Sequence, residues 1–211
     1  MDRTKIIAAT VTTQRGTVVN VDKKGKPLRP AITWLDQRSA EVKGDVPGLW
    51  KWLFKLAGVE DVVHRFRENS QAAWISQNQA DIWKQTHKYL LLSGYLTFKL
   101  TGEFKDSIAS QVGYIPYDYK KRAWANSSDW RYSVAPELKK SMLPELVEPG
   151  ERLGELTQIA AEHLGLFAGL PVIASASDKA CEILGSGGNR PDIACMSYGT
   201  TATINTTNNK Y

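Results

Sequence analysis

The sequence predicts an α/β domain that carries an inserted β-hairpin and a helical region. Short β-branched apolar runs lie near both ends of the chain, a glycine-containing turn follows the second run, and helical patterns fill the middle. The length of 211 residues, with 42% hydrophobic and 23% charged residues, is typical of a folded chain with room for one domain and part of another.

The first part of the chain is predicted to be β-structure. The run KIIAATVTT at 5–13 is typical of a buried strand. A second strand at 16–22, a turn at 23–27 and a third strand at 28–34 follow as a hairpin or meander. The densest lysine cluster lies in that turn and the other basic residues are scattered. The lysine cluster is therefore explained as a solvated hairpin tip. A nucleic-acid-binding surface would need a larger basic face, so we expect no nucleic-acid partner despite the formal charge of +5.

The pattern becomes helical from residue 36 onward. A helix is predicted over 48–58, with Gly58 as its end, and a pair of helices over 71–86 and 87–102, with Gly102 as the second end. A loop with short extended pieces is predicted over 104–118, and a short helix near 136–143.

The last part is predicted to run helix, strand, helix and then two strands. Thr157 is a candidate N-cap and Gly165 a helix stop, and a strand follows at 171–177. Asp178 opens the next helix, and 193–207 forms two strands around a Gly-Thr-Thr turn. This order places Asp178 at the carboxyl end of a strand, where open α/β sheets bind ligands.

Polar groups follow three of the predicted strands. They are Gln14 with Arg15, Asp36 with Arg38, and Asp178. If the strands share one sheet, these groups meet along one edge and suit a polyhydroxylated ligand. Taken singly, each is better explained as a strand-end turn or a surface ion pair. Asp178 fits two compatible roles, a helix cap and a base that takes a proton from a hydroxyl.

The segment SYGTT at 197–201 is a glycine turn with hydroxyls beside it. Such a turn either presents backbone N–H groups and a threonine hydroxyl to a phosphate or is an ordinary hairpin turn. The three histidines show no ligand spacing, so we expect no dedicated metal site.

The location of the protein is predicted from what the sequence lacks. The two cysteines make no disulfide framework, which favours a reducing cytoplasm. We find no signal-peptide pattern and no apolar run long enough to span a bilayer, so we expect no membrane partner.

Five segments, in this order, resemble the FGGY carbohydrate kinases, the group that contains glycerol kinase and the kinases of xylulose, ribulose and gluconate. The segments are TTQRGTVV, PAITWLDQR, LTGEFKDS, SASDKACEILGSG and MSYGTTA, and the resemblance covers almost the full chain. It implies two domains of the ribonuclease H-like, actin-like ATPase fold, with sugar bound beside the first domain and ATP held mainly by the second. It also implies phosphorylation of a sugar or polyol hydroxyl by ATP, with Mg²⁺ carried on the nucleotide.

The resemblance implies roles for individual residues. Asp178 matches the general base that accepts a proton from the attacking hydroxyl. The matches to substrate contacts are Gln14, Arg15, the aromatic wall Trp34, and the remaining W-x-D-x-R residues Asp36 and Arg38. The matches to the second phosphate-binding turn are Gly199 and Thr200, with Thr201 beside them.

Two departures from glycerol kinase change the expected substrate. Gly16 stands where that kinase has a glutamate, and Ser107 falls near the position of a substrate-contacting tyrosine. Both changes remove groups that clasp glycerol. We therefore expect a different or larger sugar or polyol, with Ser107 on the substrate side.

The resemblance also implies that the chain is a fragment. The family begins with a strand and a D-x-G-T turn that are not found ahead of Met1. We expect 1–188 to be the N-terminal substrate-binding domain without its first phosphate-binding hairpin, and 189–211 to begin the C-terminal nucleotide-binding domain. The chain alone should be inactive and prone to associate, and the full-length protein should be a homo-oligomer.

Two other functions compete with the kinase. A non-catalytic sugar-binding or regulatory module would have little need for both Asp178 and a phosphate turn. An actin-like or chaperone-like ATPase ranks last, because it would not need the W-x-D-x-R element.

Overall fold

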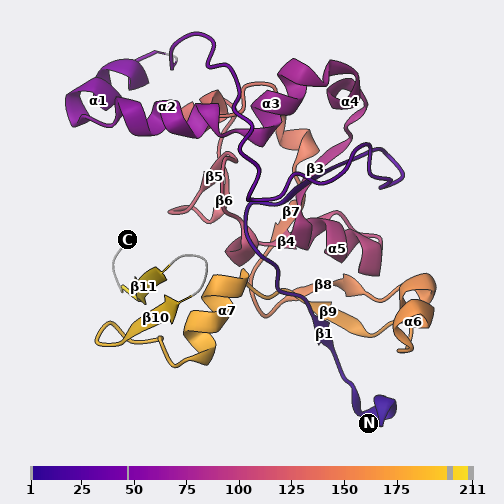
Figure 1. The fold of residues 1–211 in the computed structure, drawn as a ribbon. Helices are drawn as coiled ribbons and strands as arrows, with labels where there is room; N and C mark the ends of the chain where they lie inside the picture. The colour runs from indigo at the N-terminus through magenta and orange to yellow at the C-terminus, as the bar shows by residue number, and fades with distance from the viewer. Residues whose placement is uncertain (1, 47, 199–201, 209–211) are drawn as a thin grey trace.

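A three-stranded sheet contains the first predicted strand and the strand predicted at 171–177 (Figure 1). The computed structural model describes residues 2–46, 48–198 and 202–208. Strand β1 (Ala9–Thr10) lies parallel to β9 (Pro171–Ile173), which pairs antiparallel with β8 (Arg152–Glu155). Both β1 and β9 are shorter than the predicted strands. Because they are parallel, the residues that follow them leave the sheet at one edge.

The second strand pairs with a segment that the sequence predicted to be helical. Strand β2 (Val18–Val21) is antiparallel to β3 (Lys88–Leu91), and α5 (Leu92–Thr101) begins only after β3. The prediction of helix over 87–91 was therefore wrong. Tyr89 and Leu91 pack into one buried cluster and Leu90 into another, so this stretch buries both faces, as a central strand does.

The third strand of the predicted hairpin forms only in part. Ile32 and Pro27 make isolated bridges to Val18 and Val21, and no continuous strand covers 28–34. Prolines at 27 and 30 have no N–H to donate, which prevents a regular ladder here.

Four helices form the inserted helical region. They are α1 (Trp50–Ala57), α2 (Glu60–Glu68), α3 (Gln71–Asn78) and α4 (Ala80–Gln85). Figure 1 shows them at the end of the molecule opposite β1, β8 and β9. Gly58 ends α1 in a left-handed conformation, as predicted. The helix predicted over 71–86 is divided at Gln79, whose backbone leaves the helical region and whose side-chain oxygen accepts from Arg29.

Short elements connect this region to the sheet. Strand β4 (Lys105–Ser107) is parallel to β7 (Glu145–Val147), and β5 (Tyr117–Asp118) pairs with β6 (Ala123–Trp124). The prediction of a loop with extended pieces over 104–118 is confirmed. The helix predicted near 136–143 is only a 3₁₀ turn at Lys140–Met142, and further 3₁₀ turns lie at Arg3–Lys5, Ile108–Ser110 and Trp130–Ser133.

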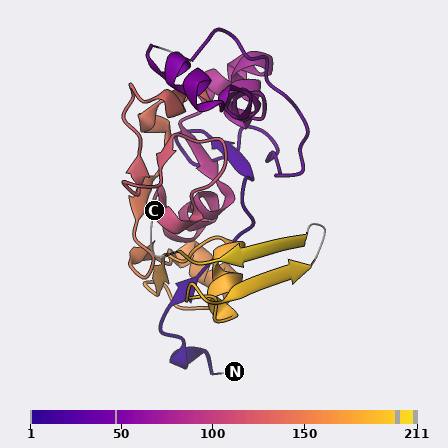
Figure 2. The same cartoon turned by 90° about the vertical axis from the view of Figure 1, so that its left-hand side faces the viewer.

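The last part of the chain follows the predicted order closely. Helix α6 (Gln158–Leu164) is capped by the hydroxyl of Thr157, which accepts from the Ala160 amide, and Gly165 ends it in a left-handed conformation. Helix α7 (Asp178–Gly185) follows β9, and β10 (Ala194–Tyr198) pairs antiparallel with β11 (Ala202–Thr206). Figure 2 shows β10 and β11 extending from α7 beyond the rest of the molecule.

Within the described part of the chain, three buried clusters hold the fold together, and the smallest contains Val19, Val21 and Leu90. The other two are larger. One is built around β2 and β3 and includes Ile75, Tyr89 and Leu138. The other lies around β8, β9 and α6 and includes Leu153 and Val172. The second cluster supports the sheet from which Asp178 emerges, so the position of Asp178 depends on this core.

Candidate functional site

Asp178 lies where three segments of the chain converge. It follows β9, and its backbone N–H donates to the carbonyl of Thr13 (3.0 Å), which follows β1. The preceding N–H, of Ser177, donates to the carbonyl of Ala109 (3.2 Å) after β4. Fixed main-chain contacts therefore hold Asp178 at the edge where β1 and β9 end.

The carboxylate of Asp178 does not cap α7 in the way the sequence suggested. Ser177 occupies the N-cap position, its side chain makes no capping hydrogen bond, and Asp178 is the first helical residue. Its Oδ1 accepts from the adjacent Lys179 N–H (2.8 Å), and it has no other partner among the described residues. A half-buried carboxylate with free acceptor capacity is suited to take a proton from a hydroxyl.

Hydroxyl groups join the two strands beyond the end of their backbone ladder. Ser175 Oγ donates to the Val11 carbonyl (2.5 Å), and Thr12 Oγ1 donates to the Ala176 carbonyl (2.8 Å). These bonds connect residues 164 apart in sequence. They keep the segments before Gln14 and before Asp178 side by side.

The turn at Gln14 and Arg15 leaves both side chains exposed. The Gln14 amide makes a long hydrogen bond to Thr17 Oγ1 (3.4 Å). Gly16 has φ of +74°, a conformation that disfavours a side chain, and a Cβ there would lie 3.5 Å from Cβ of Trp34. The backbone therefore disfavours any residue with a side chain at this position, and it brings Gly16, which follows Gln14 and Arg15, against Trp34.

Trp34, Asp36 and Arg38 behave differently from one another. Trp34 is 50% exposed, so its ring is available to a ligand. Arg38 Nε lies 2.8 and 3.0 Å from the two oxygens of Asp36, and its guanidinium lies 4.5 Å from the centre of the Trp74 ring. The hydrogen bonds from Arg38 hold the pKa of Asp36 below its usual range. The Asp36–Arg38 pair thus fixes the loop against α3, while Trp34 presents its surface.

Ser107 is buried, and its hydroxyl is engaged within the protein. It donates to the carbonyl of Ser175 and accepts from the Ala109 amide (3.2 Å). Both contacts brace the segment that leads to Asp178. Ser107 therefore lies next to the candidate base, and its hydroxyl points at backbone.

Asp106 is an unusual residue near the site that the sequence reasoning missed. It is 1% exposed, and its carboxylate accepts from Ser93 Oγ and from the Ser107 amide, both at 2.8 Å. Burial raises its pKa to about 6, although these donors favour the charged form. The available signal was an acidic residue within the short extended segment 104–107, directly before Ser107.

The predicted phosphate turn falls on residues 199–201, which lie outside the described residues. The strands on either side are described, with Tyr198 opposite Ala202 and Ser197 opposite Thr203. The prediction of two strands over 193–207 is therefore confirmed, and the roles of Gly199, Thr200 and Thr201 stay predictions.

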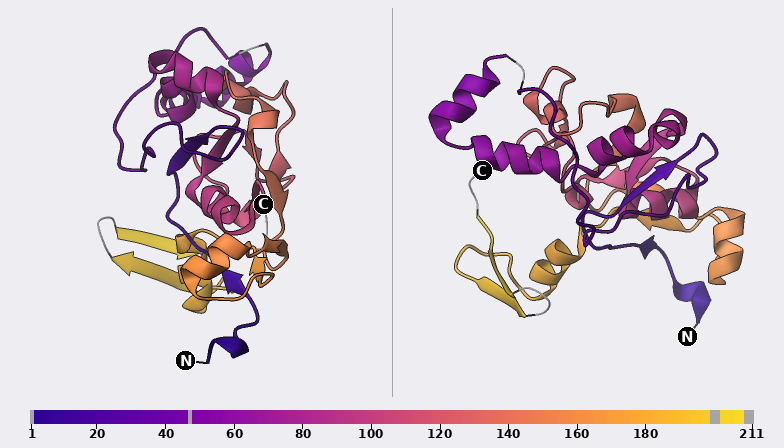
Figure 3. Two further views of the ribbon diagram at one scale, coloured as in Figure 1. Left: turned by 90° about the vertical axis from the view of Figure 1, so that its right-hand side faces the viewer. Right: turned by 45° about the horizontal axis from the view of Figure 1, so that its top comes forward.

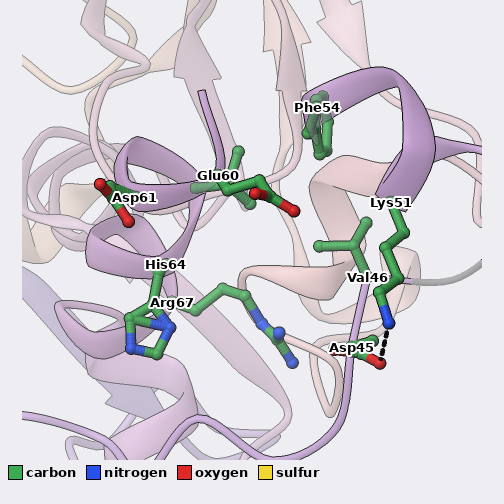
Figure 4. Close-up of a pocket in the computed structure, with 9 residues that line it drawn as sticks. Asp45, Val46, Lys51, Phe54, Glu60, Asp61, His64 and Arg67 are labelled. Atoms are coloured by element: carbon green, nitrogen blue, oxygen red, sulfur yellow. Dashed lines mark hydrogen bonds and ion pairs between the residues drawn. The ribbon is translucent and has the colours of Figure 1, made fainter. Parts of the chain in front are cut away.

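A hollow of about 330 Å³ lies between α1, α2 and the loop before α1 (Figure 4). Asp45 and Lys51 form an ion pair at its edge (2.7 Å), and Arg67 donates to the carbonyls of Lys43 and Gly44. None of the predicted site residues line this hollow. The Arg67 guanidinium is occupied by these backbone carbonyls, so the hollow results from the packing of the helices. It is separate from the edge of the sheet that carries Asp178.

The described residues contain neither a cluster suited to a metal ion nor a helix suited to a membrane. Across 2–46, 48–198 and 202–208, no group of three or more His, Cys, Asp or Glu side chains has the arrangement of a metal site. Within those ranges no helix combines the length and the apolar character needed to cross a bilayer.

Known proteins resemble this chain in sequence and in fold. A xylulose kinase from Staphylococcus xylosus is 26% identical over 183 residues, which cover 87% of this chain and 37% of that protein. An uncharacterized sugar kinase, YgcE of Escherichia coli K12, is 44% identical over 108 residues, which cover 51% of this chain and 22% of that protein. The crystal structure of a gluconate kinase from Lactobacillus acidophilus matches with a TM-score of 0.75 at 20% identity.

The structural match covers 96% of this chain and 40% of the gluconate kinase, so the chain spans well under half of the length of these proteins. It shows that the chain has the α/β, ribonuclease H-like and actin-like fold of these kinases. The model of the N-terminal domain of the FGGY carbohydrate kinases matches residues 1–185. The chain therefore belongs to the FGGY family of carbohydrate kinases and carries the family's N-terminal domain.

Proposed function

We propose that the full protein transfers a phosphoryl group from ATP to a hydroxyl of a sugar or polyol, and that this chain supplies its substrate side. The observation that carries the proposal is the position of Asp178, whose carboxylate lies at the edge where the parallel strands β1 and β9 end. Relatives named as xylulose kinase and L-fuculokinase support the reaction class.

The proposed roles follow from exposure and contacts. Asp178 takes the proton of the attacking hydroxyl. Gln14, Arg15 and Trp34 contact the sugar, since all three are exposed beside the same turn. Asp36, Arg38 and Ser107 hold the loops that carry these contacts, through the bonds described above.

The phosphoryl donor in this proposal is ATP, with Mg²⁺ carried on its phosphates. Gly199, Thr200 and Thr201 would hold the nucleotide phosphates, with backbone N–H groups and hydroxyls of the kind that bind anions. Phosphoryl transfer depends on positioning and charge neutralisation, so a base on one side and a phosphate-binding turn on the other supply what the reaction needs.

The remaining proposals concern the protein as a whole. We propose that 1–188 is the substrate-binding domain and that 189–211 begins the nucleotide-binding domain. We further propose that the chain alone is inactive, and that the full protein is a cytoplasmic homo-oligomer. The match of the family's N-terminal domain to residues 1–185 supports a domain boundary near residue 188.

The test uses the full reading frame and measures ADP release with ATP and Mg²⁺ over a panel of ketoses, polyols and sugar acids. Asp178→Asn should lower kcat by about 100- to 10,000-fold on the substrate that the wild type accepts, because a general base contributes that much. The matched control is Asp81→Asn, which changes an aspartate with a 92% exposed side chain on α4. An Asp178→Asn enzyme with wild-type turnover would refute the role of the base. Sugar binding without turnover would favour the non-catalytic module.

A further inference from the structure

Lys179 joins the first turn of α7 to β10. Its Nζ lies 2.6 Å from Oε2 of Glu182, which is one turn further along α7, and 2.8 Å from Oγ of Ser197. Hydrogen bonds from a charged donor to a carboxylate are about twice as strong as neutral ones. The Lys179 side chain is 32% exposed, so this contact is more shielded than an ordinary surface ion pair.

This contact joins the helix that carries the proposed base to the neighbouring strand. Lys179 directly follows Asp178, the proposed base. Ser197 lies near the end of β10. One side chain thus bridges the helical turn that carries the base and β10.

A second attachment lies at the other end of α7. Gly188 is buried, and a Cβ there would lie 2.5 Å from Sγ of Cys195 and 2.7 Å from Cγ2 of Ile183. The hydroxyl of Thr207 donates to the Gly188 carbonyl. Helix α7 and the β10–β11 pair are therefore packed together at both ends, and both views of Figure 3 show them side by side.

The attachment of α7 to the rest of the domain is slighter. The Asp178 N–H bonds to the Thr13 carbonyl (3.0 Å), and Cys181 Sγ lies 3.6 Å from the Ala176 carbonyl. No residue of α7 is buried. The direction of the helix, and with it the aim of the Asp178 carboxylate, depends on what holds α7 against β10.

We propose that Lys179 is a positioning residue that sets the direction of the Asp178 carboxylate by holding the first turn of α7 against β10. This inference rests on the proposed kinase function. Displacing a reacting group by about 1 Å costs about 100-fold in rate. The cost should fall on kcat, because the proposed sugar contacts at Gln14, Arg15 and Trp34 do not involve Lys179.

The experiment compares variants of the full reading frame. Lys179→Met removes the charge and keeps a side chain of similar length. It should lower kcat by about 10- to 100-fold, with a sugar KM within about twofold of wild type. Lys179→Arg, which keeps charge and donors, should recover most of the loss. Ser197→Ala should lower kcat, and the double variant should lose less than the sum of the two single losses, because both changes remove the contact between Lys179 and Ser197.

The matched control is Lys84→Met. Lys84 pairs with Asp81 three residues earlier on α4 (3.7 Å), with its side chain 76% exposed and far from α7 in the fold. Its replacement should leave kcat and KM unchanged. Wild-type kcat in Lys179→Met, or additive losses in the double variant, would overturn the proposal.

Hydrogen exchange separates this inference from the proposed function. Amide protons of β10 and β11 should exchange faster in Lys179→Met than in wild type or Lys84→Met, whether or not a substrate is found. If the wild-type protein phosphorylates nothing in the panel, the proposed function fails. The exchange rates of β10 and β11 then test by themselves whether Lys179 holds β10 against α7. Unchanged exchange in β10 and β11 would then reject the role of Lys179.

Discussion

Replacing Asp106 with asparagine should change how the stability of the protein depends on pH. The carboxyl group is almost completely buried, and burial raises its pKa from an ordinary value of 3.8 to about 6. Asparagine has nearly the same shape and no charge, and it can still accept from the Ser107 amide that bonds to Asp106. The variant therefore removes the titration with little change in packing.

The sign follows from the direction of the shift. The folded state binds this proton more tightly than the unfolded state, so the contribution of Asp106 to stability is fully present below about pH 4 and is lost as the pH rises through about 6. The difference between 3.8 and about 6 corresponds to about 3 kcal/mol, at 1.36 kcal/mol for each unit of pKa. Asp36 acts in the opposite direction, because its pKa is lowered by Arg38.

The assay is urea unfolding followed by tryptophan fluorescence between pH 4 and pH 7.5. The quantity to plot is the free energy of unfolding of the wild type minus that of Asp106→Asn, since carboxylates common to both proteins cancel. This difference should fall by about 2 kcal/mol between pH 4 and pH 7, because the rest of the total is already lost at pH 4. The same measurement on Asp81→Asn is the control for replacing an exposed aspartate with asparagine. A flat plot for Asp106→Asn would refute the assignment of a buried, protonatable carboxyl group.

Three further predictions test the sugar side and the local backbone. In the full reading frame, Trp34→Ala should raise the sugar KM about tenfold with a smaller change in kcat, because the half-exposed ring can pack against the sugar. An unchanged KM would show that Trp34 does not contact the sugar. Gly16→Glu should lower the free energy of unfolding by about 1–2 kcal/mol in urea titrations, since φ is +74° there, and an unchanged midpoint would contradict the strain. Thr157→Ala should cost about 1 kcal/mol by the same measurement, because it removes the N-cap of α6; a loss near zero would show that the cap contributes little.

Local signals predicted those parts of the fold that local chemistry determines. Thr157 and Gly165 bound α6 as expected, because a hydroxyl cap and a left-handed glycine act within one helical turn. The strand before Asp178 was also correct, because the apolar run and the helix after it are adjacent in sequence. In each case the deciding contacts lie within a few residues.

The errors arose where distant residues decide the structure. The run at 88–91 was predicted to be helical, yet it pairs with Val18–Val21, which lies about seventy residues earlier and which no local pattern identifies as its partner. Asp178 was expected to cap its helix, but Ser177 occupies the N-cap position, and the N–H of Asp178 donates to the carbonyl of the distant Thr13. Asp106 was missed because its burial depends on α5, including the approach of Gly94.

The pairing of β1 with β9 also determines when the candidate site can form during synthesis. Thr10 and Ile173 are joined by a side-chain bond across 163 residues, and the Thr12 and Ser175 bonds span 164. At about 5–20 residues per second, the ribosome takes several seconds or more to make the partner of β1 after β1 itself. The helical region and the β2–β3 pair can form in that interval, before the segment that brings Asp178 beside Thr13 has been made. A nascent chain that stalls before residue 171 would then hold β1 without its partner β9, and a strand edge that lacks its partner is prone to pair with other chains.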